Sequence, residues 1–467
     1  MVQAALSLRL IWSNTAFGDE ALYLWAGHLE WTHWEYGTPI PNFAAYFSGA
    51  PVLYPPLAAL ADSIAGLAGA RILSLLFMLG ATALLYQTAM RLFGSRQTAF
   101  FACAVFVGLG PTADLGAFAT YDAMAIFLLA LATSLAIRSD GRAAEVLLVC
   151  AAVAMALADS VKYASLLWNP VVIALAGLAA SGGSRRAIAR AFRLSCYSAA
   201  ILLPAIFVLG GQQYINGISF TTLDRQAADS AVSATVILAD SADWAGVLFF
   251  LALIGVVAIG RASGRRMRLT MVVLAAAVVL APLHQAQIHT LTSLYKHVVF
   301  GCWFGACAAG VALAKASSVN EAKGWRIGAA AVVFIGILGV GQASNMFAFW
   351  PSSARLTAAV RHFLPSSNGL VLAPNADGHV INYYLGALAG PNGVRDPGSA
   401  TPAQISTMIS EGAFSIIVAD LPCNPDPGEC RVLKAVTASR RYRAASVIPW
   451  SDHFGSGKFE ILLRTLA

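Results

Sequence analysis

Residues 143–186, AAEVLLVCAAVAMALADSVKYASLLWNPVVIALAGLAASGGSRR, decide the fold of this chain. They contain two apolar stretches, near 143–161 and 164–180, and each approaches the roughly 20 apolar residues that a helix needs to cross a bilayer. Lys162 and Tyr163 separate the two stretches, whereas Arg185 and Arg186 follow the second one. Paired apolar stretches with uneven basic charge at their two ends predict a polytopic membrane protein.

The same pattern continues along most of the chain. Hydrophobic residues make up 58% of the sequence and charged residues 11%, against roughly 45 to 50% and about 25% in a soluble domain. Apolar stretches lie near 71–90, 98–113, 117–137, 143–161, 164–180, 194–211, 243–260, 269–283, 298–314 and 326–343. Met1 to Trp12 is too short to span unaided. We therefore expect an all-α membrane region over 1–350 with about 10 or 11 spans.

Basic residues gather in alternate loops. One set of loops holds Arg91, Arg96, Arg138, Arg142, Arg185, Arg186, Arg190, Arg193, Arg261, Arg265, Arg266, Arg268, Lys315, Lys323 and Arg326. The opposite set holds essentially Lys162, Arg225 and Lys296. The positive-inside rule places the rich set in the cytoplasm and the poor set outside. The net charge of +7 mostly reflects this bias, and no basic patch interleaved with aromatic residues points to a nucleic-acid partner.

The first outer segment, about 13–70, is amphipathic and does not span. Glu20, Tyr23, Gly27 and Glu30 fall on one helical face, and Leu22, Trp25, Ala26 and Leu29 form another. This pattern is typical of a helix lying in the membrane interface. Tyr54-Pro55-Pro56-Leu57 is expected to break the chain, because proline restrains the backbone and lacks a donor. A second short surface helix is expected after it.

From about Pro351 the composition becomes more polar and predicts a small α/β domain over 351–467, outside the cytoplasm. The expected strands are 369–373, 414–420 and 459–463, and the expected helices are 378–385, 402–411 and 431–440. Cys423 and Cys430 bracket the loop CNPDPGEC, and a disulfide between them would require an oxidising compartment. Two reduced thiols are the alternative. A zinc site lacks further Cys or nearby His ligands. The other five cysteines lie in apolar spans and are expected to pack there.

Ionisable residues gather at the outer ends of the spans. They are Asp19, Glu20, Asp114, Asp122, Asp159, Lys162, His284, His289, Lys296 and His297. A charge at the centre of a membrane helix costs on the order of 2.5 to 3.5 kcal/mol on insertion scales, so some interaction should offset it. The clustering predicts either one site at the outer membrane face or ordinary loop residues.

Five of these residues have both a structural and a functional interpretation. Asp19 is either the N-cap of the interfacial helix or a general base. Asp122 could cap its helix or bind sugar hydroxyls. Lys162 and Lys296 could snorkel to the interface or neutralise a phosphate, and His297 could pack, cap or bind a ligand.

Several motifs together resemble a known family. They are Phe17-Gly18-Asp19-Glu20-Ala21-Leu22-Tyr23, Tyr54-Pro55-Pro56-Leu57, Ala119-Thr120-Tyr121-Asp122 and Lys162-Tyr163. In this order and topology they resemble the polyprenyl-phosphate-dependent glycosyltransferases of the GT-C superfamily, nearest to the protein O-mannosyltransferase and lipid A aminoarabinose transferase group. One departure is the incomplete first helix before the Asp-Glu pair. Together with the Arg- and Ala-rich composition, the resemblance implies a bacterial plasma-membrane enzyme.

The resemblance implies an inverting transfer of a sugar from a polyprenyl-phosphate donor to a glycolipid, polysaccharide or protein acceptor outside the cytoplasm. It assigns Asp19 as general base, Asp122 to the sugar or acceptor site, and Lys162 to the donor phosphate. The polar residues beside them in the motifs are expected to bind substrate: Glu20, Tyr23, Tyr54, Tyr121 and Tyr163. Lys296 and His297 are added because of their charge and side of the membrane.

Cofactors and other functions are constrained as well. A divalent cation near Asp19 and Asp122 stays open as an alternative, but no ligand set with diagnostic spacing supports one. Neither a Walker loop nor a Ser-His-Asp order competes for the assignment. The main alternative is a transporter or lipid flippase, which would place ionisable groups near the membrane midplane in broken helices, usually with repeat symmetry. Neither signature is seen, and a non-catalytic scaffold is the third alternative.

Overall fold

The computed structural model describes residues 1–139, 141–222, 231–259, 263–319, 321–364, 370–373, 375–389, 393–395, 401–422, 427–453 and 455–465. Their contacts divide the chain into two compact units, which are described separately. The first comprises Met1–Ile11, Asn42–Tyr54 and Arg71–Ser344. The second comprises Trp12–Pro41, Pro55–Ala70 and Asn345–Ala467.

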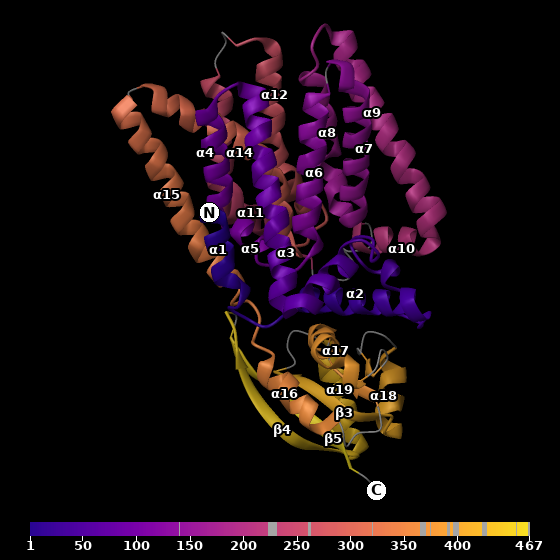
Figure 1. The fold of residues 1–467 in the computed structure, drawn as a ribbon. Coiled ribbons are helices and arrows are strands. Elements are labelled where there is room, and N and C mark those ends of the chain that lie inside the picture. Colours follow the sequence, from indigo (N-terminus) through magenta and orange to yellow (C-terminus); the bar gives the residue numbers. More distant parts are fainter. Residues whose placement is uncertain are drawn as a thin grey trace. The chain divides into compact units, whose positions relative to one another are not determined.

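The first unit is a set of membrane helices that run side by side (Figure 1). Its helices are α1 (Val2–Ile11), α3 (Tyr54–Phe93, of which this unit holds the part from Arg71), α4 (Arg96–Gly108), α5 (Gly110–Leu115), α6 (Tyr121–Arg138), α7 (Ala144–Val161), α8 (Asn169–Leu178), α9 (Ser184–Pro204), α10 (Gly211–Thr222), α11 (Ala234–Ala258), α12 (Arg265–Ala276), α13 (Leu280–Gln287), α14 (Leu294–Val319) and α15 (Glu321–Met346). Among the described residues, eight helices are long and apolar enough to cross a membrane, and three apolar helices are shorter. The prediction of a multi-pass, all-α membrane region is confirmed.

Two of the predicted spans are shorter than expected, and proline explains both. The predicted span 98–113 is interrupted after Gly108. A new short helix, α5, begins at Gly110, and Pro111 lies in the first turn of this helix. The predicted span 164–180 starts with the 3-10 turn Tyr163–Trp168, and α8 begins only at Asn169, again with a proline in its first turn. Proline fits the first turn of a helix but not its interior.

The connections that are rich in Arg and Lys lie at one end of this unit, as the charge pattern predicts. They are the links from α3 to α4, α6 to α7, α8 to α9, α11 to α12 and α14 to α15, at the upper end in Figure 1. The opposite ends of α6, α7, α13 and α14 carry Asp122, Lys162, His284 and His297.

Helix α14 is the centre of the first unit. Its apolar 18-residue window is entirely buried, against 22% of the corresponding window in α15. Small residues allow this, because they let helix backbones approach closely in a membrane. A Cβ atom on Gly255 of α11 would lie 2.1 Å from the Ala308 carbonyl oxygen, and one on Gly310 would lie 2.5 Å from that of Thr98 in α4. The backbones of α11 and α4 therefore lie directly against the backbone of α14.

The second unit contains a five-stranded sheet of order β2-β1-β3-β5-β4. Its strands are β1 (Leu370–Leu372), β2 (Val394–Arg395), β3 (Phe414–Leu421), β4 (Tyr442–Ser451) and β5 (Ser456–Arg464). β1 pairs in parallel with β2 and β3, whereas β5 is antiparallel to β3 and β4. The helices are α16 (Ala354–Phe363), α17 (Asn375–Ala389), α18 (Pro402–Glu411) and α19 (Pro427–Ser439). All six predicted elements are present, and α16, β2 and β4 are additional.

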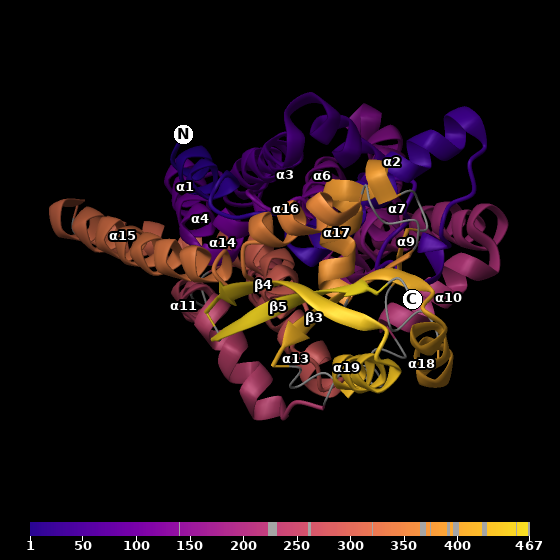
Figure 2. The same cartoon turned by 90° about the horizontal axis from the view of Figure 1, so that it is seen from below.

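Alternating residues of β3 build two cores, one on each face of the sheet. Ile416 and Val418 pack with α16 and α17, whereas Ile417 and Ala419 pack with α18 and α19. Figure 2 shows the two helix pairs on opposite sides of the strands. This is the period of two that a strand imposes on its side chains.

The second unit also holds α2 (Gly18–Tyr36) and the first part of α3. The prediction that the two prolines break the chain is wrong, because both lie in the first turn of α3, where a missing N–H costs nothing. The predicted short helix follows, since α3 kinks at Ala65 and Gly66, where Gly66 has a φ of +61°. Helix α2 packs so closely on this segment that a Cβ on Gly27 would lie 2.0 Å from the Pro55 carbonyl oxygen.

Candidate active site

A buried ion pair joins the outer ends of two membrane helices in the first unit. Asp122 lies in the first turn of α6 and Lys162 directly follows α7. Their side chains are 1% and 4% exposed, and Lys162 Nζ lies 3.7 Å from Asp122 Oδ1. The Thr120 hydroxyl donates to the other carboxylate oxygen, Asp122 Oδ2, at 3.0 Å. Because Lys162 is buried against a carboxylate, the snorkelling interpretation is wrong.

A short extended segment fixes Lys162 from the other side. Lys162 Nζ donates to Ser48 Oγ at 3.0 Å, and the backbone N–H of Tyr163 donates to the Ser48 carbonyl at 3.0 Å. The N–H of Ala50 donates to the Ser160 carbonyl at 2.7 Å. Between them, a Cβ on Gly49 would lie 1.9 Å from the Val161 carbonyl oxygen, so only glycine permits this approach. Sequence analysis missed Ser48.

Two of the predicted tyrosines, Tyr54 and Tyr121, pack against each other, and Tyr121 directly precedes Asp122 in α6. The rings of Tyr54 and Tyr121 lie 5.4 Å apart, and both residues are fully buried. The Tyr54 hydroxyl lies 3.4 Å from Ser74 Oγ, and Phe47 packs edge-on to Tyr121 at 6.2 Å. Asp122 itself is 1% exposed.

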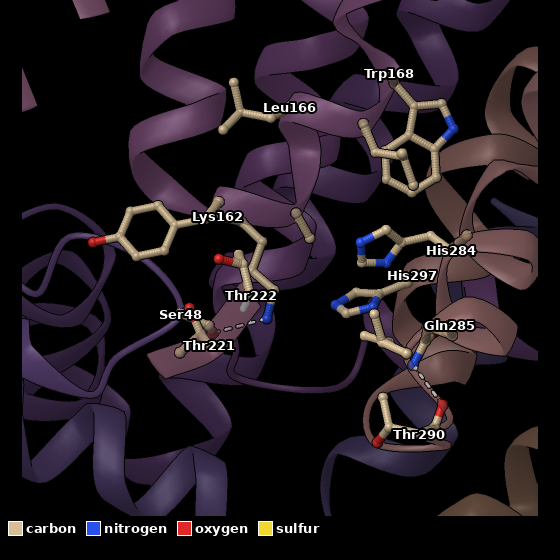
Figure 3. A pocket seen from close by; sticks show the side chains of 15 residues that line it. Ser48, Lys162, Leu166, Trp168, Thr221, Thr222, His284, Gln285, Thr290 and His297 are labelled. Carbon is tan, nitrogen blue, oxygen red and sulfur yellow. Dashed lines mark hydrogen bonds between the residues drawn. The ribbon is translucent and has the colours of Figure 1, made fainter. Parts of the chain in front are cut away.

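A cavity of about 330 Å³ opens beside the lysine. It is lined by Ser48, Lys162, Tyr163, Ala164, Leu166, Leu167, Trp168, Thr221, Thr222, Ala281, His284, Gln285, Ile288, Thr290 and His297. Figure 3 shows His284, His297 and Gln285 reaching the cavity from one side and Lys162 from the other. The cavity therefore joins a cation, two imidazoles and several apolar side chains.

The structure brings together only part of the predicted set from the first unit. Lys162, Tyr163 and His297 line the cavity, and Asp122 pairs with Lys162. Lys296 is buried and does not line the cavity; its Nζ lies 5.0 Å from the ring centre of Phe118 and 5.5 Å from that of Tyr295. A cation over aromatic faces is stabilised electrostatically.

Asp19, Glu20 and Tyr23 belong to the second unit, where α2 begins. The N-cap of this helix is Phe17, and its N–H donates to Glu20 Oε2 at 3.0 Å. The N-cap interpretation of Asp19 is therefore wrong, because Asp19 is the second residue of the helix and Glu20 makes the capping bond. Asp19 is partly exposed, whereas Glu20 and Tyr23 are buried.

Two further predictions concern metal ions and cysteines. Among the residues that the structure describes, no group of three or more His, Cys, Asp or Glu side chains is placed to hold a metal ion. Cys430 is disulfide-bonded, and its predicted partner, Cys423, lies outside the described residues. The remaining five cysteines are free thiols.

Comparisons with known proteins agree with the motifs. The family model of the dolichyl-phosphate-mannose-protein mannosyltransferases matches residues 32–180. No curated protein matches the chain by sequence. Solved structures that match include ArnT from Cupriavidus metallidurans bound to undecaprenyl phosphate, with a TM-score of 0.63 and 15% identity over 98% of this chain and 97% of that one.

Two other solved structures share the fold. The oligosaccharyltransferase AglB from Archaeoglobus fulgidus, in complex with an inhibitory peptide and a dolichol-phosphate, has a TM-score of 0.61 and 11% identity over 98% of this chain and 72% of that one. The arabinofuranosyltransferase AftD from Mycobacteria has a TM-score of 0.61 and 16% identity over 100% of this chain and 40% of that one. The predicted resemblance is therefore confirmed: this chain has the GT-C fold of membrane glycosyltransferases, with a mannosyltransferase-family signature over residues 32–180.

Proposed function

We propose that this protein is an integral-membrane glycosyltransferase that moves a sugar from a polyprenyl-phosphate donor to an acceptor outside the cytoplasm. The acceptor is a glycolipid, a polysaccharide or a protein, and the transfer inverts the anomeric carbon. The mannosyltransferase signature supports this proposal, as do the lipid phosphates held by ArnT and AglB. We assign catalysis to residues 1–350 and an extracytoplasmic location to residues 351–467.

The buried lysine beside the cavity carries the proposal. A polyprenyl-phosphate donor is a long hydrocarbon with an anionic head, so its binding site needs apolar walls and a cation. The cavity offers apolar walls and Lys162. The lysine lies 3.7 Å from Asp122, beyond hydrogen-bonding distance, and Asp122 Oδ1 has no hydrogen-bond partner within the described residues. Lys162 lines this cavity, and a lysine binds a phosphate as a point charge.

The chemistry then needs one base. The acceptor hydroxyl attacks the anomeric carbon from the face opposite the phosphate, which inverts that carbon. Its proton passes to Asp19, while the bond between the anomeric carbon and the phosphate oxygen breaks and leaves its electron pair on the oxygen. Glycoside hydrolases need a second carboxyl group to protonate their leaving group. The leaving group here is a phosphate, which is already a stable anion. A cation that neutralises this phosphate therefore takes the place of the second carboxyl group.

Charge and redox chemistry support the proposed location. The basic connections lie at the upper end of the first unit in Figure 1, whereas Lys162 follows the opposite end of α7. The positive-inside rule favours a cytoplasmic position for the basic end. The cavity then faces outward. The disulfide bond of Cys430 supports an oxidising location for the C-terminal residues. We propose the plasma membrane of a bacterium as the site of action.

The test begins with mass spectrometry of lipid that copurifies with the protein, which identifies the polyprenol and its sugar. Turnover of that donor is then compared with donor binding for Asp19→Asn and for Glu411→Gln, an exposed carboxylate at the end of α18. We expect Asp19→Asn to lower turnover by about 10² to 10⁴ with donor binding intact, and Glu411→Gln to change neither. A transporter or flippase would be indifferent to both changes, and this outcome would refute the proposal.

A further inference from the structure

A second buried carboxylate lies about one turn before Lys162, and the proposed reaction does not use it. Asp159 belongs to the last turn of α7 and is 1% exposed. An ionisable side chain in a membrane span is costly, so it needs partners. The Asn169 amide donates to Asp159 Oδ2 at 2.7 Å, and the Ser165 hydroxyl lies 2.9 Å from Asp159 Oδ1. Both carboxylate oxygens therefore bond to residues that follow Lys162.

These bonds cross the break between two membrane helices. Helix α7 ends at Val161, and Lys162 has an extended backbone with a φ of −146° and a ψ of 111°. The 3-10 turn Tyr163–Trp168 follows, and α8 begins at Asn169. A 3-10 turn has poorer hydrogen-bond geometry than an α-helix, and runs longer than about four residues are uncommon. Side-chain bonds from outside the turn therefore help to hold this one.

Ser165 connects the carboxylate to the backbone of Lys162. The Ser165 N–H donates to the Lys162 carbonyl oxygen at 2.9 Å, and the Ser165 hydroxyl lies 2.7 Å from the same oxygen. The hydroxyl proton is thus shared between this carbonyl and Asp159 Oδ1. At the other end of the lysine, Nζ donates to Ser48 Oγ. Lys162 is therefore held at its carbonyl through Asp159 and at its ammonium group through Ser48.

The far end of the turn is anchored as well. The indole N–H of Trp168 donates to the Ala277 carbonyl at 3.1 Å. The Trp168 ring stacks on Phe300 of α14, with ring centres 4.9 Å apart and 18° between the planes. Trp168 and Lys162 both line the cavity (Figure 3). The turn is thus a part of the cavity wall that is fixed at both ends, by Asp159 and by Trp168.

We infer that Asp159 is a positioning residue, which holds Lys162 where its ammonium group meets the phosphate of a polyprenyl-phosphate donor. It acts through its hydrogen bonds to Ser165 and Asn169, and Asp159 is not among the described residues that line the cavity. This inference rests on the proposed function and deepens it. Because the effect is geometric, a neutral side chain that keeps both hydrogen bonds should replace the carboxylate, whereas an apolar side chain should not.

Two substitutions of Asp159 separate geometry from charge. Asparagine keeps an oxygen that accepts from Ser165. Its amide group can donate to Asn169 Oδ1, which has no partner in the described part of the chain, once the Asn169 amide has turned over. Leucine has a similar branched shape but can make neither bond. Asp159→Asn should therefore retain the turn, and Asp159→Leu should release it.

The experiment measures the dissociation constants of undecaprenyl phosphate and of uncharged undecaprenol for the full chain in detergent. Their ratio reports the interaction with the phosphate, whereas a general loss of structure weakens the binding of both ligands. We expect the wild type and Asp159→Asn to prefer undecaprenyl phosphate. The preference of Asp159→Leu should be about tenfold smaller, which is about 1.4 kcal/mol. In a variant that carries Lys162→Met and Asp122→Asn, Asp159→Leu should not change the ratio further, because it acts through Lys162.

Two other variants complete the test. Ser165→Ala removes one of the two bonds and should lower the preference by a smaller factor, and it replaces Asp159→Leu if that protein does not fold. Arg190→Gln is the matched control. Arg190 is also buried, and its guanidinium donates to the carbonyl oxygens of Ser139 and Ala136, at the end of α6 away from Asp122. This change should lower the temperature of unfolding and leave the ratio unchanged.

The outcomes separate the inference from the proposed function. The inference is wrong, while the proposed function stands, if Asp159→Leu and Ser165→Ala keep the wild-type ratio or if Asp159→Asn loses it. The same holds if Arg190→Gln lowers the ratio as much as Asp159→Leu, or if Asp159→Leu still lowers it without Lys162. If the wild type binds undecaprenyl phosphate no better than undecaprenol, the proposed function fails and this inference fails with it.

Discussion

Two networks of ionisable side chains, one in each unit, differ in how tightly they are built. In the first unit, Lys162 and Asp122 are almost fully buried and yet stay 3.7 Å apart. In the second unit, His28 Nε2 lies 2.7 Å from Asp62 Oδ2, although the His28 side chain is 41% exposed. The Tyr383 hydroxyl donates to the other oxygen of Asp62 at 2.5 Å.

The difference separates a structural network from a candidate ligand site. Asp62 joins α2, the first part of α3 and α17 through short hydrogen bonds, so both of its oxygens are used. Lys162 and Asp122 are costly to bury, because their mutual attraction at 3.7 Å only partly repays the desolvation of two charges. Lys162 also lines the cavity, so an anionic ligand bound there would meet its charge. The following predictions test this contrast.

The largest effect is expected from Lys162→Met. It leaves the buried Asp122 carboxylate uncompensated, and breaking such a pair typically costs about 3 to 5 kcal/mol of stability. Adding Asp122→Asn should restore most of the unfolding free energy but not the binding of polyprenyl phosphate. Thermal unfolding and lipid binding measured on both variants check this. Recovery of lipid binding in the double variant would show that Lys162 has only a structural role.

A smaller loss of stability, without a loss of lipid binding, is expected from Asp62→Asn. The change removes the charge from two hydrogen bonds, which are worth about 1.5 to 3 kcal/mol when one partner is charged. Stability should fall while polyprenyl-phosphate binding stays within a factor of two or so of the wild type, well below the tenfold that 1.4 kcal/mol represents. A large loss of lipid binding without loss of stability would erase the contrast between the two networks.

The smallest effect is expected at Glu30, a buried carboxylate of α2. Burial raises the pKa of Glu30 above its ordinary value of 4.5, and nearby His33 partly opposes the rise. The folded state therefore holds this proton more tightly than the unfolded chain, so the stability contribution falls as pH rises through the raised pKa. Glu30→Gln should be slightly more stable than the wild type at pH 7, and the difference should vanish below about pH 4.5. Chemical denaturation at both pH values measures it.

Local signals made some elements predictable. Helix α18 was predicted with its observed bounds, because Thr401 and Gln404 form a capping box and Gly412 ends the helix in the left-handed region. By contrast, β4 was missed. Most of its side chains are exposed, since it is the edge strand beside β5, and its sequence lacks clear alternation. Burial pattern therefore decided which strands could be found.

The candidate site was only partly predictable for a different reason. Charge and topology placed Asp122 and Lys162 at the same end of the spans, and the structure pairs them. Ser48 and Gln285 were missed because polar, uncharged residues carry no such signal, and Ser48 reaches Lys162 across 114 positions of sequence. Lys296 has the expected charge and side, yet it faces aromatic rings. Which way a side chain points is set by packing that periodicity does not encode.

The burial of α14 has a consequence for how the protein responds to its lipid environment. Bilayers differ in thickness, and spanning helices adjust to a mismatch by tilting or by deforming the lipid around them. Only 22% of the apolar window of α15 is buried in the protein, which leaves most of it for acyl chains, whereas the corresponding window of α14 is entirely buried. A thinner or thicker membrane would therefore tilt the outer helices first. The depth of His297 in the bilayer should therefore stay constant across host membranes. The depth at which the cavity binds a lipid phosphate should stay constant with it.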